Sequence, residues 1–412
     1  MSGHETGQNN PMNTQLQPFT PFIPSDKASQ KAGLSDKAWQ LNAAAAKLAG
    51  QIHPITRKTV TNHMAVINSY YSNLIEGNST RPFEIRAAQR GDFLADPTKR
   101  DLQLESLAHI RVQNWIGEQT VDLNQICTMD FIRAIHECFY RDLPPSLCEI
   151  KNKEGKVVDT LIPGQFRQRD VEVGVHVAPS FNDVPGLMKS FFDIYHPDRF
   201  AGERKVIAVM AAHHRLAWIH PFVDGNGRIA RLLTDLLLRV VGLESEGVWC
   251  LSRGLAKNID RYKLALAGAD ATRQGDYDGR GALTESGLIT FIDFMLDMAL
   301  DQVGYMEELL QLKTMKERIT SYVQARNDHR VQNYGEINPV AAQVLYHAFV
   351  EGSIARGQAT TLTNMPERSG RRVITQLREE GLLGEVSPKS ELTWEIPEHA
   401  EPWYFPQLTP QG

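Results

Sequence analysis

The twelve residues from His220 to Arg231, HPFVDGNGRIAR, constrain this chain more than any other segment. They place two glycines and two arginines between two stretches with helical periodicity. Small residues let backbone N–H groups approach an anion at the start of a helix, where the helix dipole adds positive potential. Guanidinium groups add strong donors for phosphate oxygens. The segment therefore predicts a polyphosphate-binding loop that connects two helices.

Four side chains of this loop suit more specific roles. Arg228 falls in the first turn of the second helix, and Arg231 follows three residues later on the same face. Asp224 is a candidate ligand for Mg²⁺, which prefers one or two carboxylates together with substrate phosphates. His220 titrates near neutral pH and is the candidate general base. The alternative interpretation is a glycine-rich helix connection with a structural histidine and solvated arginines, and it needs all these residues to coincide within twelve positions.

The segment also resembles the signature of Fic-domain proteins, His-x-Phe-x-Asp/Glu-Gly-Asn-Gly-Arg-x-x-Arg, and fills every specified position. The likeness extends upstream through PGQFRQRDVEVGVHVAPS, which resembles the flap hairpin of that family, and downstream through LSRGLAKNIDRYKLAL. Alternating valines in the upstream stretch independently indicate a strand or hairpin. The resemblance implies a mainly α fold: a Fic-type helical core with a short β-hairpin flap.

The activity that this resemblance implies is transfer of AMP from ATP to a Ser, Thr or Tyr hydroxyl of a target protein and of the chain itself, with release of pyrophosphate. His220 would accept the hydroxyl proton, Asp224 would hold Mg²⁺, and Phe222 would anchor the loop in the core. The strand through the flap would align the target by main-chain pairing. By the same resemblance, the nucleotide-binding residues are Gly225, Asn226, Gly227, Arg228, Arg231, Val173, Gly174, Val175 and His176.

A second motif precedes the core. Ser72 and Glu76, followed by Gly77, are similar to the inhibitory motif of the family, Ser/Thr-x-x-x-Glu-Gly/Asn, and lie one turn apart on one helix face. The resemblance implies the class with an N-terminal inhibitory helix, in which Glu76 pairs with Arg231 and ATP binds unproductively. The alternative is an ordinary helix end with an exposed glutamate. In some relatives the same glutamate positions water to remove AMP, and the sequence leaves that role open.

Patterning divides the chain into four parts. Residues 1–35 are rich in polar residues and proline and predict a flexible N-terminal arm. Residues 36–100 predict helices and contain the inhibitory motif. Residues 101–315 form the expected Fic catalytic core. Residues 335–412 have a helix, a shorter helix, a third helix and two short strands, the order of a winged-helix-like module.

The charge balance limits the partners. Lys and Arg number 44 against 49 Asp and Glu, a formal charge of −5, which argues against a chain that coats nucleic acid or an acidic membrane. The N-terminus has no signal-peptide pattern, and we find no apolar stretch long enough to cross a bilayer. Four scattered cysteines fit a reducing compartment. We therefore expect a cytoplasmic protein without a membrane partner.

The C-terminal module raises a rival function. Its third helix carries Arg368, Arg371, Arg372 and Arg378, side chains that suit DNA phosphates. However, residues 336–412 contain six Lys and Arg against ten Glu, a net charge of −4, which argues against DNA binding. Protein contact, in a homodimer or in target selection, is the favoured role. The rival is a transcriptional regulator whose Fic core senses nucleotide without catalysis.

Three further patterns in the sequence have simpler explanations. Gly225-x-Gly227-x-x-Ala230 follows a helix and not a strand, so a dinucleotide-binding fold is rejected. His213 and His214 are expected to be packed histidines, and residues 274–285 a structural loop instead of a calcium site. Relatives also transfer phosphate, UMP or phosphocholine. The phosphate-transferring branch has Lys where this chain has Gly227, which favours AMP.

Overall fold

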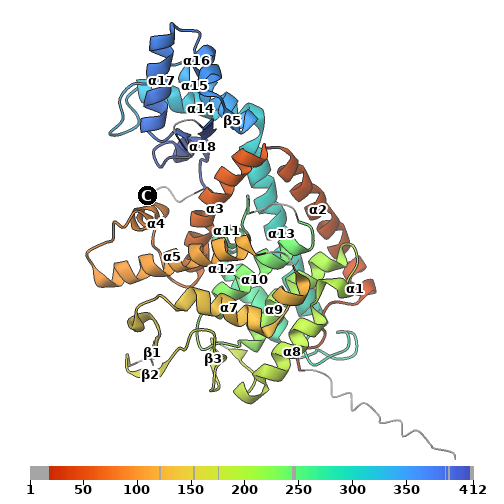
Figure 1. The fold of residues 1–412 in the computed structure, drawn as a ribbon. Coiled ribbons are helices and arrows are strands. Elements are labelled where there is room, and N and C mark those ends of the chain that lie inside the picture. Colours follow the sequence, from red (N-terminus) through yellow and green to blue (C-terminus); the bar gives the residue numbers. More distant parts are fainter. Residues whose placement is uncertain are drawn as a thin grey trace, which may run out of the picture.

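The computed structural model describes residues 18–408 except 120, 121, 152, 153, 175, 244–246, 386, 388 and 389. The described chain is mainly helical, as the sequence predicts, and it also contains short two- and three-stranded sheets. Figure 1 shows a large helical body with two small hairpins at one end and a C-terminal module at the other. No helix of the described residues is both long enough and apolar enough to cross a membrane. All four cysteines are buried and free.

Two consecutive helices form the centre of the large body. Helix α9 (Arg204–Ile219) is buried along almost its whole length, and α10 (Asn226–Val240) packs against it. The stretch after the motif has the helical periodicity that the sequence predicts. Val240 is partly buried, and the other apolar positions of its stripe are fully buried: Ile229, Leu232, Leu233, Leu236 and Leu237. The candidate motif therefore lies in a short loop whose two ends are fixed by the core.

The other helices of the body surround this pair (Figure 1). Before the motif lie α1 (Asp26–Lys31), α2 (Leu34–Gly50), α3 (Pro54–Ile75), α4 (Pro82–Gln89), α5 (Pro97–Glu118), α6 (Leu123–Ile126), α7 (Met129–Tyr140) and α8 (Val184–Ile194). After it lie α11 (Leu251–Lys257), α12 (Ile259–Asp270) and α13 (Glu285–Leu310). The predicted inhibitory motif lies at the end of α3, where Glu76 is the C-cap residue and Gly77 follows with a φ of 93°.

Two antiparallel hairpins project from the body. Strands β3 (Glu172–Val173) and β4 (His176–Val177) pair where the sequence predicts the flap. Strands β1 (Glu149–Lys151) and β2 (Val157–Thr160) form a second hairpin, which the sequence analysis did not predict. Both β1 and β2 are largely exposed on their two faces, so they lack the alternation of apolar and polar residues that marks a half-buried strand.

The N-terminal segment differs from the expectation. Residues 1–17 of the predicted flexible arm lie outside the described residues, whereas residues 18–35 pack on the body. Phe19 is fully buried against Phe22 and Trp218, and the Tyr195 hydroxyl donates to the Phe22 carbonyl. Two aromatic side chains thus anchor a segment whose polar composition indicates a loose tail.

The C-terminal module contains α14 (Leu312–Asn327), α15 (Ala341–Glu351), α16 (Arg356–Leu362), α17 (Glu367–Glu379) and α18 (Glu401–Tyr404). Strands β5 (Ser353–Ile354), β6 (Leu383–Gly384) and β7 (Leu392–Trp394) form one sheet in the order β5-β7-β6. Helix α14 packs against α15 and α18, and buried Arg326 of α14 forms an ion pair with Glu380 at 2.7 Å. The packed unit therefore includes α14, which precedes the predicted start at residue 335.

Candidate active site

His220 is held in an uncommon backbone conformation at the end of α9. Its φ of 50° and ψ of 61° lie in the left-handed region, which residues other than glycine rarely adopt. The buried guanidinium of Arg167 donates to the His220 carbonyl at 2.8 Å and to the carbonyl of Pro179 at the base of the flap. Arg167 thus fixes both the direction of the chain at His220 and its place beside the flap.

The hydrogen bonds of His220 define its tautomer. Nδ1 lies 3.3 Å from the Ala217 carbonyl oxygen, which can only accept, so Nδ1 carries the proton in this contact. The other nitrogen, Nε2, is then unprotonated in the neutral ring. Burial lowers the pKa of His220 to about 4, against a smaller opposing effect of the Ala217 bond. His220 is therefore neutral at pH 7 and has a nitrogen able to accept a proton.

Asn226 fixes the shape of the loop with its side chain. Its Oδ1 accepts from the Phe222 backbone N–H at 2.9 Å, and its Nδ2 donates to the Phe222 carbonyl at 2.8 Å. Phe222 is fully buried and stacks on His136 with ring centroids 4.0 Å apart. The Asn226 amide is thus used to hold the loop, so only its backbone N–H is available to the predicted anion nest.

The glycines at the start of α10 are each required by a close approach. Gly225 has a φ of 82°, and a Cβ atom there would lie 2.7 Å from the Tyr140 hydroxyl. A Cβ atom at Gly227 would collide with Glu76 Oε1 and lie 3.1 Å from Arg231 Nη1. A carboxylate therefore lies against the N-terminus of α10, the position at which the sequence predicts bound phosphate.

Arg231 is the residue that holds this carboxylate. Its Nη2 donates to Glu76 Oε1 at 2.7 Å and to the Ser72 carbonyl at 2.9 Å, while Nε donates to Ser72 Oγ at 2.9 Å. The side chain of Arg231 is 2% exposed, against 36% for Glu76. Ser72 of α3 and Glu76 at its C-cap thus both bind Arg231. The family resemblance implies this pairing of Glu76 with Arg231.

Asp224 has a different set of partners. Its Oδ2 accepts from the Tyr140 hydroxyl at 2.6 Å and from Arg228 Nη2 at 2.9 Å, and its side chain remains 48% exposed. Burial alone would raise its pKa, but the charge of Arg228 and the Tyr140 bond together lower it. The group is thus an ionised, accessible carboxylate, which fits a Mg²⁺ ion held by one carboxylate and substrate phosphates.

Arg228 is bound by side chains of other helices. Its guanidinium is buried, donates to Glu105 Oε1 and to the Tyr140 hydroxyl at 2.9 Å each, and lies over the Phe139 ring. The carboxylates of Glu105 and Asp224 both pair with Arg228. Arg231 instead pairs with Glu76, whose side chain is partly exposed. The partners of Arg228 therefore differ from those of Arg231, and its role as a phosphate ligand stays a prediction.

The flap lies next to the end of α9. His176 Nε2 donates to the Trp218 carbonyl at 2.8 Å, two residues before His220. Val173 pairs with His176 in the hairpin, and Gly174 has a φ of 61°. Val175 lies outside the described residues. The structure thus brings the three described flap residues to the same end of α9 as His220.

Four residues around the loop were not singled out from the sequence. These are Glu105 on α5, His136 and Tyr140 on α7, and Arg167 before the flap. His136 accepts from the Gly164 backbone N–H through Nδ1, so its Nε2 donates to the Asp224 carbonyl at 3.3 Å. The one available signal was the spacing of His136 and Tyr140, which puts two polar rings on one face of an amphipathic helix.

The other candidate sites have structural explanations. His213 is buried between Thr234 and Tyr262, as expected for a packed histidine. Asp278 accepts from the Gln274 and Ser286 backbone N–H groups and orders its loop. Within the described residues, no three His, Cys, Asp or Glu side chains form a cluster suited to a metal. A metal at Asp224 would therefore depend on ligands from the substrate.

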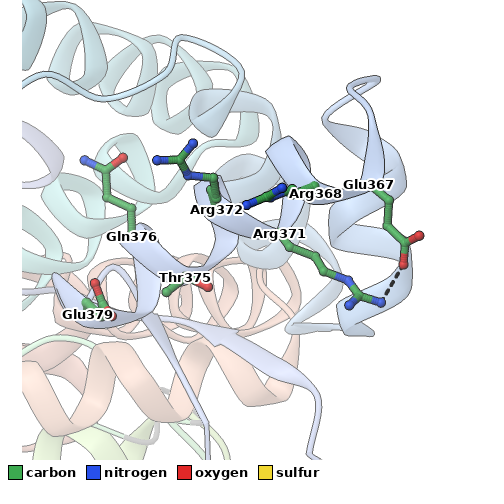
Figure 2. A pocket seen from close by; sticks show the side chains of 7 residues that line it. All are labelled: Glu367, Arg368, Arg371, Arg372, Thr375, Gln376 and Glu379. Carbon is green, nitrogen blue, oxygen red and sulfur yellow. Dashed lines mark hydrogen bonds and ion pairs between the residues drawn. The ribbon is translucent and has the colours of Figure 1, made fainter.

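The exposed face of α17 is of mixed charge (Figure 2). It carries Arg368, Arg371 and Arg372 together with Glu367 and Glu379, and Arg371 pairs with Glu367. Arg378 instead forms an ion pair with Glu385. A helix face on which glutamates accompany the arginines is less suited to DNA phosphates than an all-basic face.

Comparison with known proteins identifies the central region. Residues 126–238 match the family model described as the Fic/DOC family. The chain contains a Fic/DOC domain. It is also related to proteins named protein adenylyltransferase Fic: 34% identity over 130 residues with that of Drosophila willistoni, and 30% over 181 residues with that of Aedes aegypti.

These likenesses are partial. The two alignments cover 31% and 42% of this chain and 26% and 32% of the respective relatives. A solved structure of Fic-1 from C. elegans has 16% identity and a TM-score of 0.50, and the match covers 68% of this chain and 73% of that one. That structure supports the Fic fold.

Proposed function

We propose that this chain is a protein adenylyltransferase that transfers AMP from ATP to a Ser, Thr or Tyr hydroxyl of a target protein and of itself. The observation that carries the proposal is the juxtaposition of an unprotonated His220 Nε2 with an anion-binding helix N-terminus, where a carboxylate already lies against Gly227. A base beside a phosphate site is the arrangement that hydroxyl activation for phosphoryl-type transfer requires. The relatives named protein adenylyltransferase Fic support the same reaction.

The proposed chemistry is one in-line displacement. The His220 Nε2 accepts the proton of the target hydroxyl, whose oxygen bonds to the α-phosphorus of ATP while the bond from that phosphorus to the bridging oxygen breaks. Pyrophosphate leaves with the electron pair. Backbone N–H groups of Gly225, Asn226 and Gly227 and the guanidinium of Arg231 stabilise the phosphate charge. Asp224 would hold Mg²⁺, which would supply positive charge to neutralise the phosphates of ATP.

The flap has the proposed task of presenting the target. Its strands are short and exposed, and Val173 and Val177 are 45% and 70% exposed. An extended target segment can pair with the backbone of such an edge, which places its hydroxyl near His220. The ties from His176 to Trp218 and from Arg167 to His220 keep the hairpin in register with the base.

Glu76 is proposed as a built-in inhibitor of this reaction. Its carboxylate occupies Arg231 and lies against Gly227, so it competes with the outer phosphates of ATP for the same donors. Removal of AMP, with Glu76 directing the attacking water, is a second candidate activity at the same site.

For the C-terminal module we propose a winged-helix-like unit that contacts protein, because its strand and helix order fits that architecture and the face of α17 has mixed charge.

The proposed reaction is tested by finding which phosphate of ATP is transferred to protein. We expect the Glu76→Gly variant to incorporate label from ATP labelled at the α-phosphate and none from ATP labelled at the γ-phosphate. The reverse result would identify phosphate transfer. Salt-dependent DNA binding without incorporation of either label would favour the rival, a nucleotide-sensing regulator.

A further inference from the structure

Tyr140 and Arg228 form a buried support for the accessible carboxylate of Asp224. The Tyr140 hydroxyl donates to Asp224 Oδ2 at 2.6 Å and accepts from Arg228 Nη2 at 2.9 Å, and the same Nη2 donates to Oδ2 at 2.9 Å. The three atoms therefore contact one another pairwise. Glu105 holds the other end of the guanidinium at 2.9 Å.

The support is rigid because its members are packed. Tyr140 is 1% exposed, and its hydroxyl lies so close to Gly225 that a Cβ atom there would be 2.7 Å away. Arg228 lies over the rings of Phe139 and Tyr140. A bond from a neutral donor and a bond from a charged donor to one oxygen restrict rotation of the carboxylate. Asp224 itself stays half-exposed, so the support determines how a side chain at the surface is oriented.

We infer that Tyr140 and Arg228 are positioning residues that orient Asp224 toward the Mg²⁺ ion of the nucleotide complex. This inference rests on the proposed function, and it gives Arg228 a role other than gripping phosphate. Partners that orient a metal-binding carboxylate typically contribute 10–100-fold to metal affinity. Tyr140 acts through its hydrogen bond to Asp224.

The variant Tyr140→Phe tests this role with minimal loss of packing. In a chain that also carries Glu76→Gly, we expect it to raise the Mg²⁺ concentration for half-maximal binding of a non-hydrolysable ATP analogue by about 10–100-fold. Binding of the analogue without Mg²⁺ should stay unchanged, and excess Mg²⁺ should restore the rate of AMP transfer. Titration calorimetry measures the binding effects even if the chain transfers no AMP.

The matched control is Tyr195→Phe, which removes another buried hydroxyl, one bonded to the Phe22 carbonyl. It should leave the Mg²⁺ requirement unchanged. An unchanged Mg²⁺ requirement in Tyr140→Phe would overturn the inference. So would an equal loss of analogue binding with and without Mg²⁺, because that loss would indicate general damage to the nucleotide site.

A separate set of contacts joins the C-terminal segment to the helix that carries Glu76. Residues 401–408, here called the tail, cross α3: Phe405 stacks on His63 with ring centroids 5.7 Å apart, and the Tyr71 hydroxyl donates to the Leu408 carbonyl at 2.9 Å. Tyr71 immediately precedes Ser72, which bonds to Arg231. The tail therefore contacts the same turn of α3 that faces the candidate site.

The tail is in turn fastened to the body on both sides of α3. Glu401 is buried and forms an ion pair with Arg86 of α4. The Tyr305 hydroxyl of α13 donates to the Pro406 carbonyl at 2.9 Å, and Arg253 Nη2 of α11 donates to the Gln407 carbonyl at 3.0 Å. In Figure 1 the C-terminal module stands over α3 and α4. A change in the module would thus reach α3 through packed and hydrogen-bonded groups.

From these contacts we propose that the tail is a clamp, which keeps the end of α3 in the position where Glu76 occupies Arg231. The clamp links the C-terminal module to the inhibition proposed above, and a partner that loosens the tail would relieve that inhibition. The required coupling is a change in the population of the state in which Glu76 pairs with Arg231, because the tail contacts α3.

The test is a double-mutant comparison. Tyr71→Phe should raise AMP incorporation about two- to tenfold in the otherwise unchanged chain, the effect expected from one lost hydrogen bond. In the Glu76→Gly background it should have no effect, because the restrained contact is already gone. Tyr195→Phe is again the control, and it should leave AMP incorporation unchanged in both backgrounds.

A second measurement keeps this proposal separate from the proposed function. Hydrogen exchange of the backbone amides in residues 70–77 should be faster in Tyr71→Phe than in the parent chain, whether or not AMP is transferred. Unchanged exchange in this segment would contradict the clamp. An equal increase of AMP incorporation in both backgrounds would also contradict it.

Discussion

Replacing His220 with alanine is expected to lower AMP transfer by about 10²–10⁴-fold, the usual contribution of a general base. The physical reason is the tautomer: Nδ1 donates to the Ala217 carbonyl, so Nε2 is left as the acceptor, and burial keeps the ring neutral at pH 7. Initial rates of label incorporation from α-labelled ATP, in the Glu76→Gly background, measure the loss.

Nucleotide binding separates this loss from misfolding. His220→Ala removes no contact to the helix N-terminus, so affinity for the ATP analogue should change by less than about threefold and the melting temperature should stay close to that of the parent. A rate within about threefold of the parent would contradict the assignment of His220 as the base. The loss of rate would then be smaller than the smallest contribution expected from a general base.

Replacing Glu76 with glycine is expected to raise AMP incorporation by about 10–100-fold. The carboxylate forms a 2.7 Å charge-assisted bond to Arg231, and bonds of this type contribute about 1.5–3 kcal/mol. Removing it frees both the guanidinium and the space beside Gly227 for the outer phosphates of ATP. The variant Glu76→Gln keeps the volume but loses the charge, so its incorporation should fall between those of the parent and Glu76→Gly.

The matched control is Glu118→Gly, which places glycine at another exposed helix end, that of α5. It should leave incorporation unchanged. If Glu76→Gly and Glu118→Gly gave the same rates, helix-end flexibility and not the ion pair would explain any effect, and the inhibitory role of Glu76 would be wrong.

The loop and the two helices that hold it could be predicted from the sequence because their signals are local. The glycines, the apolar stripe of α10 and the stop at Gly77 all lie within a few residues of what they determine. The pairing of Glu76 with Arg231, 155 positions apart, followed only from the family resemblance, since no spacing rule relates such distant residues.

Other features depend on contacts that periodicity does not encode. Arg228 has the charge and the donor groups of a phosphate ligand, yet Glu105 from α5 and Tyr140 from α7 bind it inside the protein. No pattern in the sequence marks the tail, yet Phe405 and Leu408 are buried. In each case the partner comes from a distant element, and only the tertiary packing determines which groups remain free for a ligand.

In the proposed reaction, His220 directs AMP onto a protein hydroxyl and Glu76 restrains this transfer. Intact-mass spectrometry of the purified chain after incubation with Mg²⁺ and ATP tests it most directly, for the parent, Glu76→Gly and Glu76→Gly with His220→Ala. We predict a mass increase of one or more adenylyl groups in Glu76→Gly, far less in the parent and none in the double variant. An unmodified Glu76→Gly chain, or equal modification of all three, would contradict the claim.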